Sequence, residues 1–433
     1  MVLFIFTITS CGEGRSHRGG ETTNDSTSIS QGGDIGDAEN PDEIVPTHSY
    51  TKINKVTFYI ENSASMFGYV NGYTQYIDVL TELAEKPDFA RENTDRSFNF
   101  INGGEVIKIT PIGDNPSQLR PKLNKKGYKC GDYKHSNLNE MFKIALNDAN
   151  NGNISILISD GIYDVDAGSN SANAIVSQGK ATRTKFIEKL SNSNVQTIMV
   201  KLKSDFHGSY YHVSKKGSTK INQPRPYYIW IIGESELLNK YFSSDYLSSL
   251  NGYEAIARFL KVGDTNIPYQ VTAYGKKGRY RPDRENKNIL NNVEEARAGG
   301  GFGFSIAVDF SSLPFSDIFF ESIDNYAVKG SYSITEIERY DSIEKKLKGI
   351  PFGPTHLIVV HSNNKPIGKL SIILKNKFPN WINNSSMEND MDIINDSRHT
   401  VGLQYLTQGI GDAYQEFSNK DNIITSFNIE INH

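Results

Sequence analysis

Polar side chains of the kind that bind hard cations follow two apolar segments of this chain. Glu61, Ser63 and Ser65 stand at alternate positions directly after the first apolar segment, and Asp160 follows a later one. Carboxylate and hydroxyl oxygens are the ligands that Mg²⁺ prefers in proteins. If both segments are strands that end at one edge of a sheet, these four residues form a candidate site for a divalent metal ion.

The segments that must position these residues alternate between strand and helix patterns. Short apolar runs indicate strands at 56–60, 154–158, 195–202 and 227–232. Apolar residues at helical spacing indicate helices at 73–84, 138–149 and 180–190, and a further helix starts near Glu234. This alternation predicts an α/β fold with a doubly wound, mostly parallel sheet. In such sheets ligands bind beyond the carboxyl ends of the strands, which is where the candidate ligands stand.

One strand pair is expected to be antiparallel. The segments 98–101 and 106–109 flank Asn102-Gly103-Gly104, which is a hairpin signal. This hairpin would form an antiparallel edge of the otherwise parallel sheet.

The polar residues resemble the metal-ion-dependent adhesion site of von Willebrand factor A (VWA) domains. That family carries Asp-x-Ser-x-Ser after its first strand, and Glu61, Ser63 and Ser65 match this motif with Glu in place of Asp. The family also carries an Asp, usually followed by Gly, after its fourth strand, which Asp160 and Gly161 match. The resemblance implies a VWA-like or Rossmann-like sheet with Mg²⁺, Mn²⁺ or Ca²⁺ bound at its edge.

The third part of the family motif is a Thr just before a helix, for which Ser136 and Asn137 are the nearest candidates. In the family the two serines and the threonine contact the ion directly, while the aspartates often act through water. The resemblance spans residues 50–255. It implies a metal site formed by Glu61, Ser63, Ser65, Ser136, Asn137 and Asp160.

Each of these residues also fits an ordinary structural role. Ser63 and Ser65 are suited to cap the turn that follows them. Asp160 with its following glycine is suited to a turn at a strand end, and Ser136 or Asn137 is a suitable N-cap for the next helix. The sequence leaves both interpretations open.

The region 256–433 is expected to form a separate, β-rich domain. Strand patterns occur at 302–310, 331–337, 355–361, 369–374 and 423–431. Apolar residues between Leu403 and Phe417 indicate one helix, despite Gly409 and Gly411. We expect a β-sandwich with this helix packed on it.

The N-terminal region resembles a bacterial lipoprotein signal. A short apolar run leads into Ile8-Thr9-Ser10-Cys11, which is similar to a lipobox. This resemblance implies that residues 1–11 comprise a signal peptide and the lipidated Cys11, which anchors the protein to a membrane of the bacterial cell envelope. Residues 12–49 are rich in small polar residues and are expected to form a disordered linker. A buried N-terminal strand is the alternative for the apolar run.

Composition excludes several other classes of protein. The net charge of −4 argues against a nucleic-acid-binding surface. Two cysteines make neither a disulfide framework nor a zinc site, and the nine histidines show no ligand spacing.

Two functions fit the candidate site. The first is a binding module, in which an acidic side chain of a protein partner completes the coordination of the metal; no convincing catalytic base stands beside the serines, so we expect no enzyme activity. The alternative is a metal-assisted hydrolase acting on phosphate esters, with Ser63 as nucleophile and Asp160 as metal ligand. A structural lipoprotein with a degenerate site is the third possibility.

Overall fold

The computed structural model describes residues 52–433, except 169, 345–346 and 365–366. The expected signal peptide at 1–11, its Cys11 and the linker at 12–49 lie outside the described residues. No helix in the described part of the chain is both long enough and apolar enough to cross a membrane.

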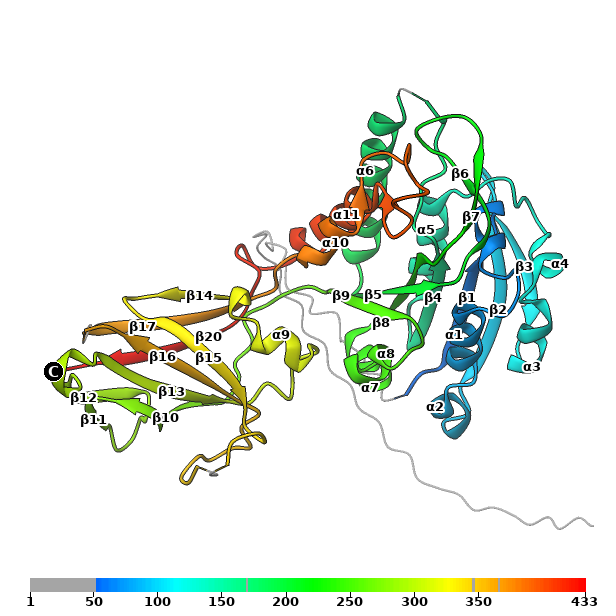
Figure 1. Ribbon diagram of the computed structural model, residues 1–433. Helices are drawn as coiled ribbons and strands as arrows, with labels where there is room; N and C mark the ends of the chain where they lie inside the picture. Colours follow the sequence, from blue (N-terminus) through cyan, green and yellow to red (C-terminus); the bar gives the residue numbers. More distant parts are fainter. Residues whose placement is uncertain (1–51, 169, 345–346, 365–366) are drawn as a thin grey trace, which may run out of the picture. The chain divides into compact units, whose positions relative to one another are not determined.

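Seven of the described strands form the first sheet, in the spatial order β3-β2-β1-β4-β8-β5-β9 (Figure 1). Strand β1 pairs in parallel with β2 and with β4. The other four neighbouring pairs are antiparallel: β2 with β3, β4 with β8, β8 with β5, and β5 with β9. The bounds are β1 (Lys55–Glu61), β2 (Asp95–Asn102), β3 (Lys108–Gly113), β4 (Asn153–Ser159), β5 (Val195–Ser204), β8 (Arg225–Glu234) and β9 (Tyr253–Phe259).

The protein is therefore a mixed α/β protein, and the expectation of a mostly parallel sheet is wrong. The expected hairpin of β2 and β3 is confirmed as an antiparallel edge. The error lies in β8, which runs antiparallel between β4 and β5. A parallel neighbour requires a crossover connection, usually a helix. Between β5 and β8 the chain instead forms a second hairpin, β6 (His207–Tyr211) and β7 (Ser218–Asn222), and returns in the opposite direction.

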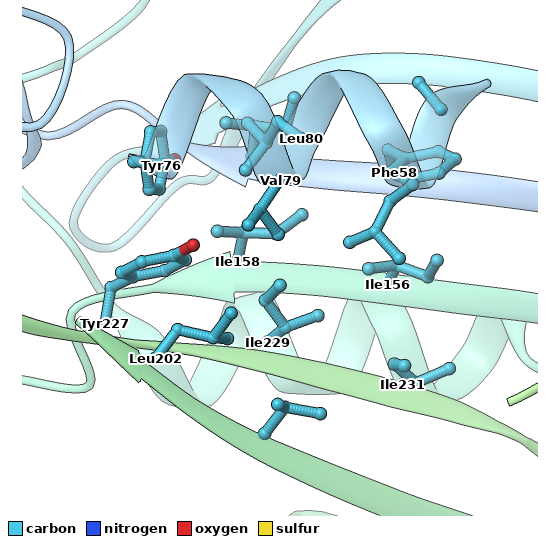
Figure 2. Close-up of a cluster of buried hydrophobic side chains, with 14 of the residues drawn as sticks. Phe58, Tyr76, Val79, Leu80, Ile156, Ile158, Leu202, Tyr227, Ile229 and Ile231 are labelled. Carbon is cyan, nitrogen blue, oxygen red and sulfur yellow. The ribbon is translucent and has the colours of Figure 1, made fainter. Parts of the chain in front are cut away.

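Helices cover both faces of this sheet. On one face, α1 (Gln75–Ala84) and α7 (Ser235–Tyr241) share a core cluster with the strands. Figure 2 shows the side chains of α1 above those of the sheet, with Val79 of the helix near Ile158 of β4. On the other face lie α5 (Leu138–Asp148), α6 (Ser171–Leu190) and α11 (Leu403–Glu416). Because β1 and β4 are buried on both faces, their sequences are nearly continuous apolar runs.

The remaining described helices are short. They are η1 (Ala64–Gly68), α2 (Pro87–Arg91), α3 (Pro116–Leu119), η2 (Arg120–Lys122), α4 (Lys125–Tyr128), α8 (Ser244–Ser248), η3 (Arg297–Gly299), α9 (Asp317–Glu321), η4 (Ile323–Asn325) and α10 (Asn380–Asn384). Among them η1 matters for the site, because it follows directly after Ser63.

Two further sheets form a sandwich, as expected, because their inner faces share one hydrophobic cluster. The four-stranded sheet has the order β10-β13-β16-β15, and the five-stranded sheet has the order β11-β12-β20-β17-β14. The bounds are β10 (Tyr269–Lys277), β11 (Arg279–Pro282), β12 (Ile289–Glu294), β13 (Phe302–Val308), β14 (Tyr326–Lys329), β15 (Ser333–Arg339), β16 (His356–Ser362), β17 (Gly368–Lys375) and β20 (Ile423–Ile431).

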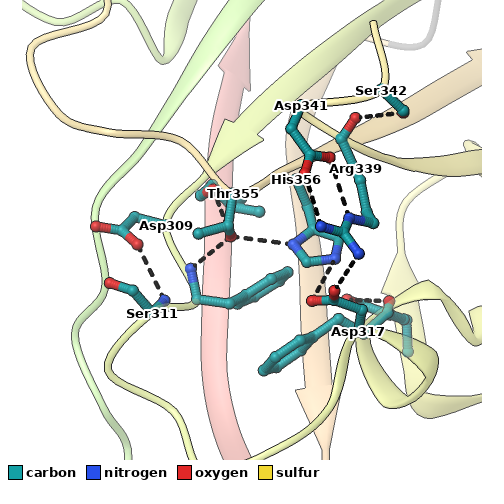
Figure 3. Close-up of polar contacts among 12 residues, drawn as sticks. Asp309, Ser311, Asp317, Arg339, Asp341, Ser342, Thr355 and His356 are labelled. Carbon is teal, nitrogen blue, oxygen red and sulfur yellow. Dashed lines mark hydrogen bonds and ion pairs between the residues drawn. The ribbon is translucent and has the colours of Figure 1, made fainter. Parts of the chain in front are cut away.

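A polar cluster attaches α9 to this sandwich (Figure 3). The Asp317 carboxylate lies 2.8 Å from Nη1 of Arg339 and 3.6 Å from Nε2 of His356. The His356 Nδ1 lies 3.0 Å from the Thr355 hydroxyl. Burial lowers the pKa of His356, although the nearby Asp317 opposes this shift. Since Asp317 and Arg339 are both about half exposed, their ion pair adds little to the stability of the fold.

The chain leaves the sandwich between β17 and β20, which are antiparallel neighbours. This excursion contains α10, β18 (Ser386–Met387), β19 (Thr400–Val401) and α11. Helix α11 packs against α6 and joins the core of the first sheet, which differs from the expectation that it packs on the sandwich. Gly409 of α11 and Gly179 of α6 meet at this contact, where a Cβ on Gly409 would overlap the carbonyl oxygen of Gly179. The glycine is thus required by close helix packing.

Candidate metal centre

Strands β1 and β4, which carry the first and the last part of the motif, end at the same edge of the sheet. In the parallel register Ile60 of β1 is level with Ile158 of β4, so Glu61 and Asp160 both follow at the carboxyl ends of neighbouring strands. Strand β2 ends level with them, because Ile101 is the partner of Glu61. The sheet therefore brings together side chains that lie about a hundred residues apart in the sequence.

Glu61 is the centre of the polar cluster. The hydroxyls of Ser63 and Ser136 both donate hydrogen bonds of 2.6 Å to its Oε1 atom. The Ser65 hydroxyl lies 2.9 Å from that of Ser63. Three hydroxyl groups from two separate segments thus surround one buried carboxylate.

Asp160 lies beside this cluster and is also buried. Its Oδ1 atom accepts a hydrogen bond of 3.2 Å from the backbone N–H of Ile162. Burial raises the pKa of Asp160, while a hydrogen bond from Ser65 and the positive charge of Arg225 oppose this shift. The turn continues through Gly161, whose φ of 72° favours glycine.

The two candidates before helix α5 have different roles. Ser136 directs its hydroxyl to Glu61, whereas the Asn137 side chain accepts a hydrogen bond of 3.2 Å from the backbone N–H of Glu140. Asn137 is therefore the N-cap of α5 and belongs to the helix rather than to the cluster. Of the six candidate ligands, the structure brings five together.

One oxygen of this cluster has no partner. The Oε2 atom of Glu61 is buried and makes no hydrogen bond within the described part of the protein. Burial first, and then the charge of Asp160, raise the pKa of Glu61 to about 7, although the hydroxyls of Ser136, Ser159 and Ser63 oppose this shift. A buried carboxylate oxygen without a donor costs free energy, and a bound cation would satisfy it. The residues present therefore fit a divalent metal ion.

The cluster differs from the common type of protein metal site. Among the described residues no group of three or more His, Cys, Asp or Glu side chains is placed to hold a metal ion. The candidate centre has only two carboxylates, Glu61 and Asp160, and takes its remaining oxygens from three serines.

The cluster forms part of the floor of a cavity of about 600 Å³. Glu61, Ser63, Ser65 and Ser136 line this cavity. Its other walls come from the loop before α5, the loop after β4 and the β6–β7 hairpin, which we call the roof. These walls carry four tyrosines and two lysines: Tyr133, Tyr163, Tyr210, Tyr211, Lys134 and Lys216. None of these six was identified from the sequence, because no motif marks them: Tyr210 and Tyr211 end strand β6, and the other four lie in loops.

Two buried asparagines fix the loop that carries Ser136. The Asn62 side-chain amide donates a hydrogen bond of 2.8 Å to the carbonyl of Tyr128. Asn102 donates one of 2.8 Å to the Asn62 side-chain oxygen and accepts one of 2.8 Å from the N–H of Asp132. The position of Asn62 inside the Glu-x-Ser-x-Ser motif is the sequence signal that could have identified it.

The roof is held by a residue far away in the sequence. The carboxylate of Asp390, in the loop between β18 and β19, accepts hydrogen bonds from the backbone N–H groups of Val213 and Ser214 at 2.6 and 2.9 Å. It also accepts one of 2.9 Å from the Tyr210 hydroxyl. Asp390 is completely buried, so the excursion from the sandwich fixes the position of the roof.

Arg225 supplies a buried positive charge next to the cluster. Its guanidinium carbon lies 4.4 Å from the centre of the Tyr210 ring, and its two terminal nitrogens make no hydrogen bond within the described residues. The positive charge of Arg225 opposes the rise that burial causes in the pKa of Asp160. Two buried carboxylates and one buried guanidinium thus lie at this edge of the sheet.

The chain matches no protein-family model, and no curated protein or solved structure matches it. The functional argument therefore rests on the geometry of the site. Its main elements are the unpaired oxygen of Glu61, the three hydroxyls around it and the cavity above them.

The raised pKa of Glu61 predicts that the metal-free protein loses stability as the pH rises. In the folded state the Glu61 carboxyl group keeps its proton up to a pH of about 7, whereas in the unfolded chain it loses this proton near pH 4.5. Between these values the folded state binds more protons, so the free energy of unfolding falls with pH, by roughly a few kcal/mol. Urea unfolding in EDTA between pH 4.5 and 7.5 measures this slope.

The control is the Glu61→Gln variant, which removes the titrating group and should flatten the slope over the same interval. The difference between the two proteins isolates Glu61 from the histidines that titrate in this range. Parallel curves for the two proteins would contradict the assignment of the raised pKa to this residue.

Proposed function

We propose that the first sheet and its helices form a VWA-like domain that binds a divalent metal ion and, through this ion, an acidic group of a protein partner. The observation that carries the proposal is the buried, unpaired Oε2 of Glu61 among three serine hydroxyls. The cavity above these atoms leaves room for a ligand.

The residues that would hold the ion are Ser63, Ser65 and Ser136 through their hydroxyls, with Glu61 and Asp160 nearby as carboxylates. Hydroxyls and carboxylates suit Mg²⁺, and they also suit Mn²⁺ or Ca²⁺. When bound, the ion supplies an open coordination position that accepts an oxygen anion.

The charges at the site support an acidic ligand. With both carboxylates ionised, Glu61, Asp160 and Arg225 together carry one net negative charge. A divalent cation turns this into one net positive charge, and a carboxylate of a partner neutralises it. Buried net charge is costly, and an acidic group of a partner neutralises the combined charge of the ion and these three residues.

The alternative function, a metal-assisted hydrolase acting on phosphate esters, is favoured by one contact. The Ser63 hydroxyl donates to Glu61, whose pKa of about 7 suits a general base. Against it, Ser136 donates to the same oxygen atom, and the further carboxylate and histidine that line the cavity have other partners. Asp164 accepts from the N–H of Ser136, and both ring nitrogens of His212 are hydrogen-bonded, to the Asp390 carbonyl and to Thr219. Hydrolysis of p-nitrophenyl phosphate that requires Mg²⁺ and disappears in Ser63→Ala would favour this alternative.

We also propose that a lipid on Cys11 anchors the protein to a membrane of the bacterial cell envelope. The lipobox-like residues before Cys11 and the polar composition of 12–49 support this location. Labelling of the protein with a radioactive fatty acid, and loss of the label in Cys11→Ala, would test it.

Calorimetric titration of Mg²⁺ and Mn²⁺ into the full-length protein tests the metal site. Ser63→Ala combined with Ser65→Ala should abolish binding, because two of the three hydroxyls are lost. Ser191→Ala combined with Ser193→Ala is the matched control, since these serines have the same spacing and bond to backbone carbonyls of α6. Equal binding by all three proteins, or no binding at millimolar metal by any of them, would refute the proposed site.

A further inference from the structure

The roof of the cavity is basic. Residues 207–222 contain Lys215, Lys216 and Lys220 and no Asp or Glu. Lys216 lines the cavity, and so does Lys134 from the loop before α5. Both side chains are exposed, and neither forms an ion pair within the described part of the chain. Two positive charges at the cavity wall are thus available to a ligand.

Besides Glu61 on the floor, the acidic residue Asp164 lines the same cavity, and it already has partners. The Asp164 carboxylate accepts a hydrogen bond of 3.1 Å from the backbone N–H of Ser136 and lies 3.4 Å from Nδ1 of His135. The Asp164 carboxylate is engaged by these two groups and forms no ion pair with Lys134 or Lys216 within the described residues.

The two lysines take no part in the charge balance of the proposed function. In the proposed function, one acidic group together with the metal ion neutralises the floor of the cavity. Lys134 and Lys216 are not part of that set, and as exposed cations at the cavity wall they are free to contact a second acidic group of the ligand. The backbone of the roof is fixed two residues before Lys216, because Ser214 donates its N–H to Asp390, and a fixed backbone loses less entropy on binding.

The volume and the walls of the cavity indicate what carries the two acidic groups. A volume of about 600 Å³ lies within the range of roughly 300–1,000 Å³ that encloses small ligands, so a short segment fits and a folded domain does not. The walls are mostly apolar and aromatic, with Tyr133, Tyr163, Tyr210 and Tyr211 among them. Tyrosine is enriched at surfaces that bind polypeptides.

We propose that this cavity binds a peptide segment with two acidic side chains, one at the metal on the floor and the other at Lys134 and Lys216. This inference rests on the proposed function and adds to it the class of ligand and a second anchoring point. It assigns to the β6–β7 hairpin the selection of doubly acidic over singly acidic segments.

Fluorescence anisotropy of labelled peptides on the full-length protein with Mg²⁺ tests the inference. The probes are Gly-Ser-Asp-Ser-Asp-Ser-Gly and the same peptide with one or with both Asp replaced by Asn. The variant is Lys134→Met with Lys216→Met. The matched control is Lys126→Met with Lys220→Met, which removes two exposed positive charges that do not line the cavity. Calorimetry of Mg²⁺ alone accompanies each protein.

The expected result is that the lysine variant binds the doubly acidic peptide about five- to tenfold more weakly, as expected for two lost charge contacts. The same variant should bind the singly acidic peptide and Mg²⁺ as the wild type does, and the control variant should bind all ligands unchanged. Three outcomes would overturn this inference while leaving the proposed function intact. They are an equal loss of affinity in the control variant, equal affinity for all three peptides, and no peptide binding by a protein that binds Mg²⁺. Tighter binding of an oligogalacturonate than of the peptide would also overturn it, whereas absence of Mg²⁺ binding would refute the proposed function itself.

Discussion

Replacing Asp390 by alanine is expected to destabilise the protein by about 3 kcal/mol, because it leaves two backbone N–H groups of the roof without acceptors. Asp390 is completely buried and accepts hydrogen bonds from Val213, Ser214 and Tyr210. Urea unfolding at neutral pH measures this change. Hydrogen exchange at Val213 and Ser214 should accelerate more than exchange in the core strands, since the roof loosens first.

The pH dependence of this variant checks the same contact. Burial alone would raise the pKa of Asp390, but the hydrogen bonds from the N–H groups of Val213 and Ser214 outweigh it and lower the pKa below its usual value of 3.8. A lowered pKa means that Asp390 contributes stability above pH 3.8, and that this contribution is lost as the pH falls through the folded pKa. The wild type and Asp390→Ala should therefore differ most at neutral pH and converge in acid.

Asp392→Ala is the matched control for this prediction. Asp392 lies in the same loop and is exposed, so its replacement should change stability by less than about 1 kcal/mol. If Asp390→Ala is no less stable than Asp392→Ala, the bonds from Asp390 do not hold the roof.

The second large effect is expected for Gly409→Val, which should cost about 3 kcal/mol through overpacking. A side chain at this position meets the backbone of α6 at Gly179, and a backbone atom cannot rotate away as a side chain does. Helix α11 must therefore move off α6, which exposes the apolar residues that it buries in the core of the first sheet. Thermal unfolding followed by circular dichroism measures the loss.

Gly411→Ala provides the comparison within the same helix. A Cβ on Gly411 lies 3.3 Å from the ring of Phe378, a side chain that can shift slightly. Alanine also favours the helix over glycine by about 1 kcal/mol. This variant should be as stable as the wild type or more stable, and a loss as large as that of Gly409→Val would show that the helix interior, rather than its contact with α6, is sensitive.

The sequence allowed the prediction of those parts of the structure that depend on local patterns. The apolar runs of β1 and β4 are continuous because both faces are covered, and a cluster of polar residues at their ends follows from the direction of the strands. The convergence of Glu61, Ser63, Ser65 and Asp160 was therefore predictable. Ser136 was named together with Asn137, and only the geometry separates the hydroxyl near Glu61 from the helix cap.

The features that the sequence did not reveal depend on long-range contacts. The direction of β8 is set by a connection that forms a hairpin in place of a crossover helix, which periodicity does not encode. The bond from Ser214 to Asp390 joins residues 176 positions apart. Gly409 looked like a defect in a helix pattern, because the residue that explains it, Gly179, lies on another helix.

The position of α11 also has a consequence for biosynthesis. Leu403, Leu406 and Ile410 complete the core on one face of a sheet whose last strand, β9, ends at Phe259. During translation the ribosome releases this sheet long before it releases the helix that covers it. The nascent chain therefore carries an apolar face that only α5 and α6 cover while the sandwich is being synthesised, and exposed apolar surface of this kind binds chaperones and aggregates readily. A ribosome stalled between β17 and α11 should accordingly hold a nascent chain that protease cleaves at α6. When the ribosome is stalled after Glu416 has emerged, α6 should be resistant.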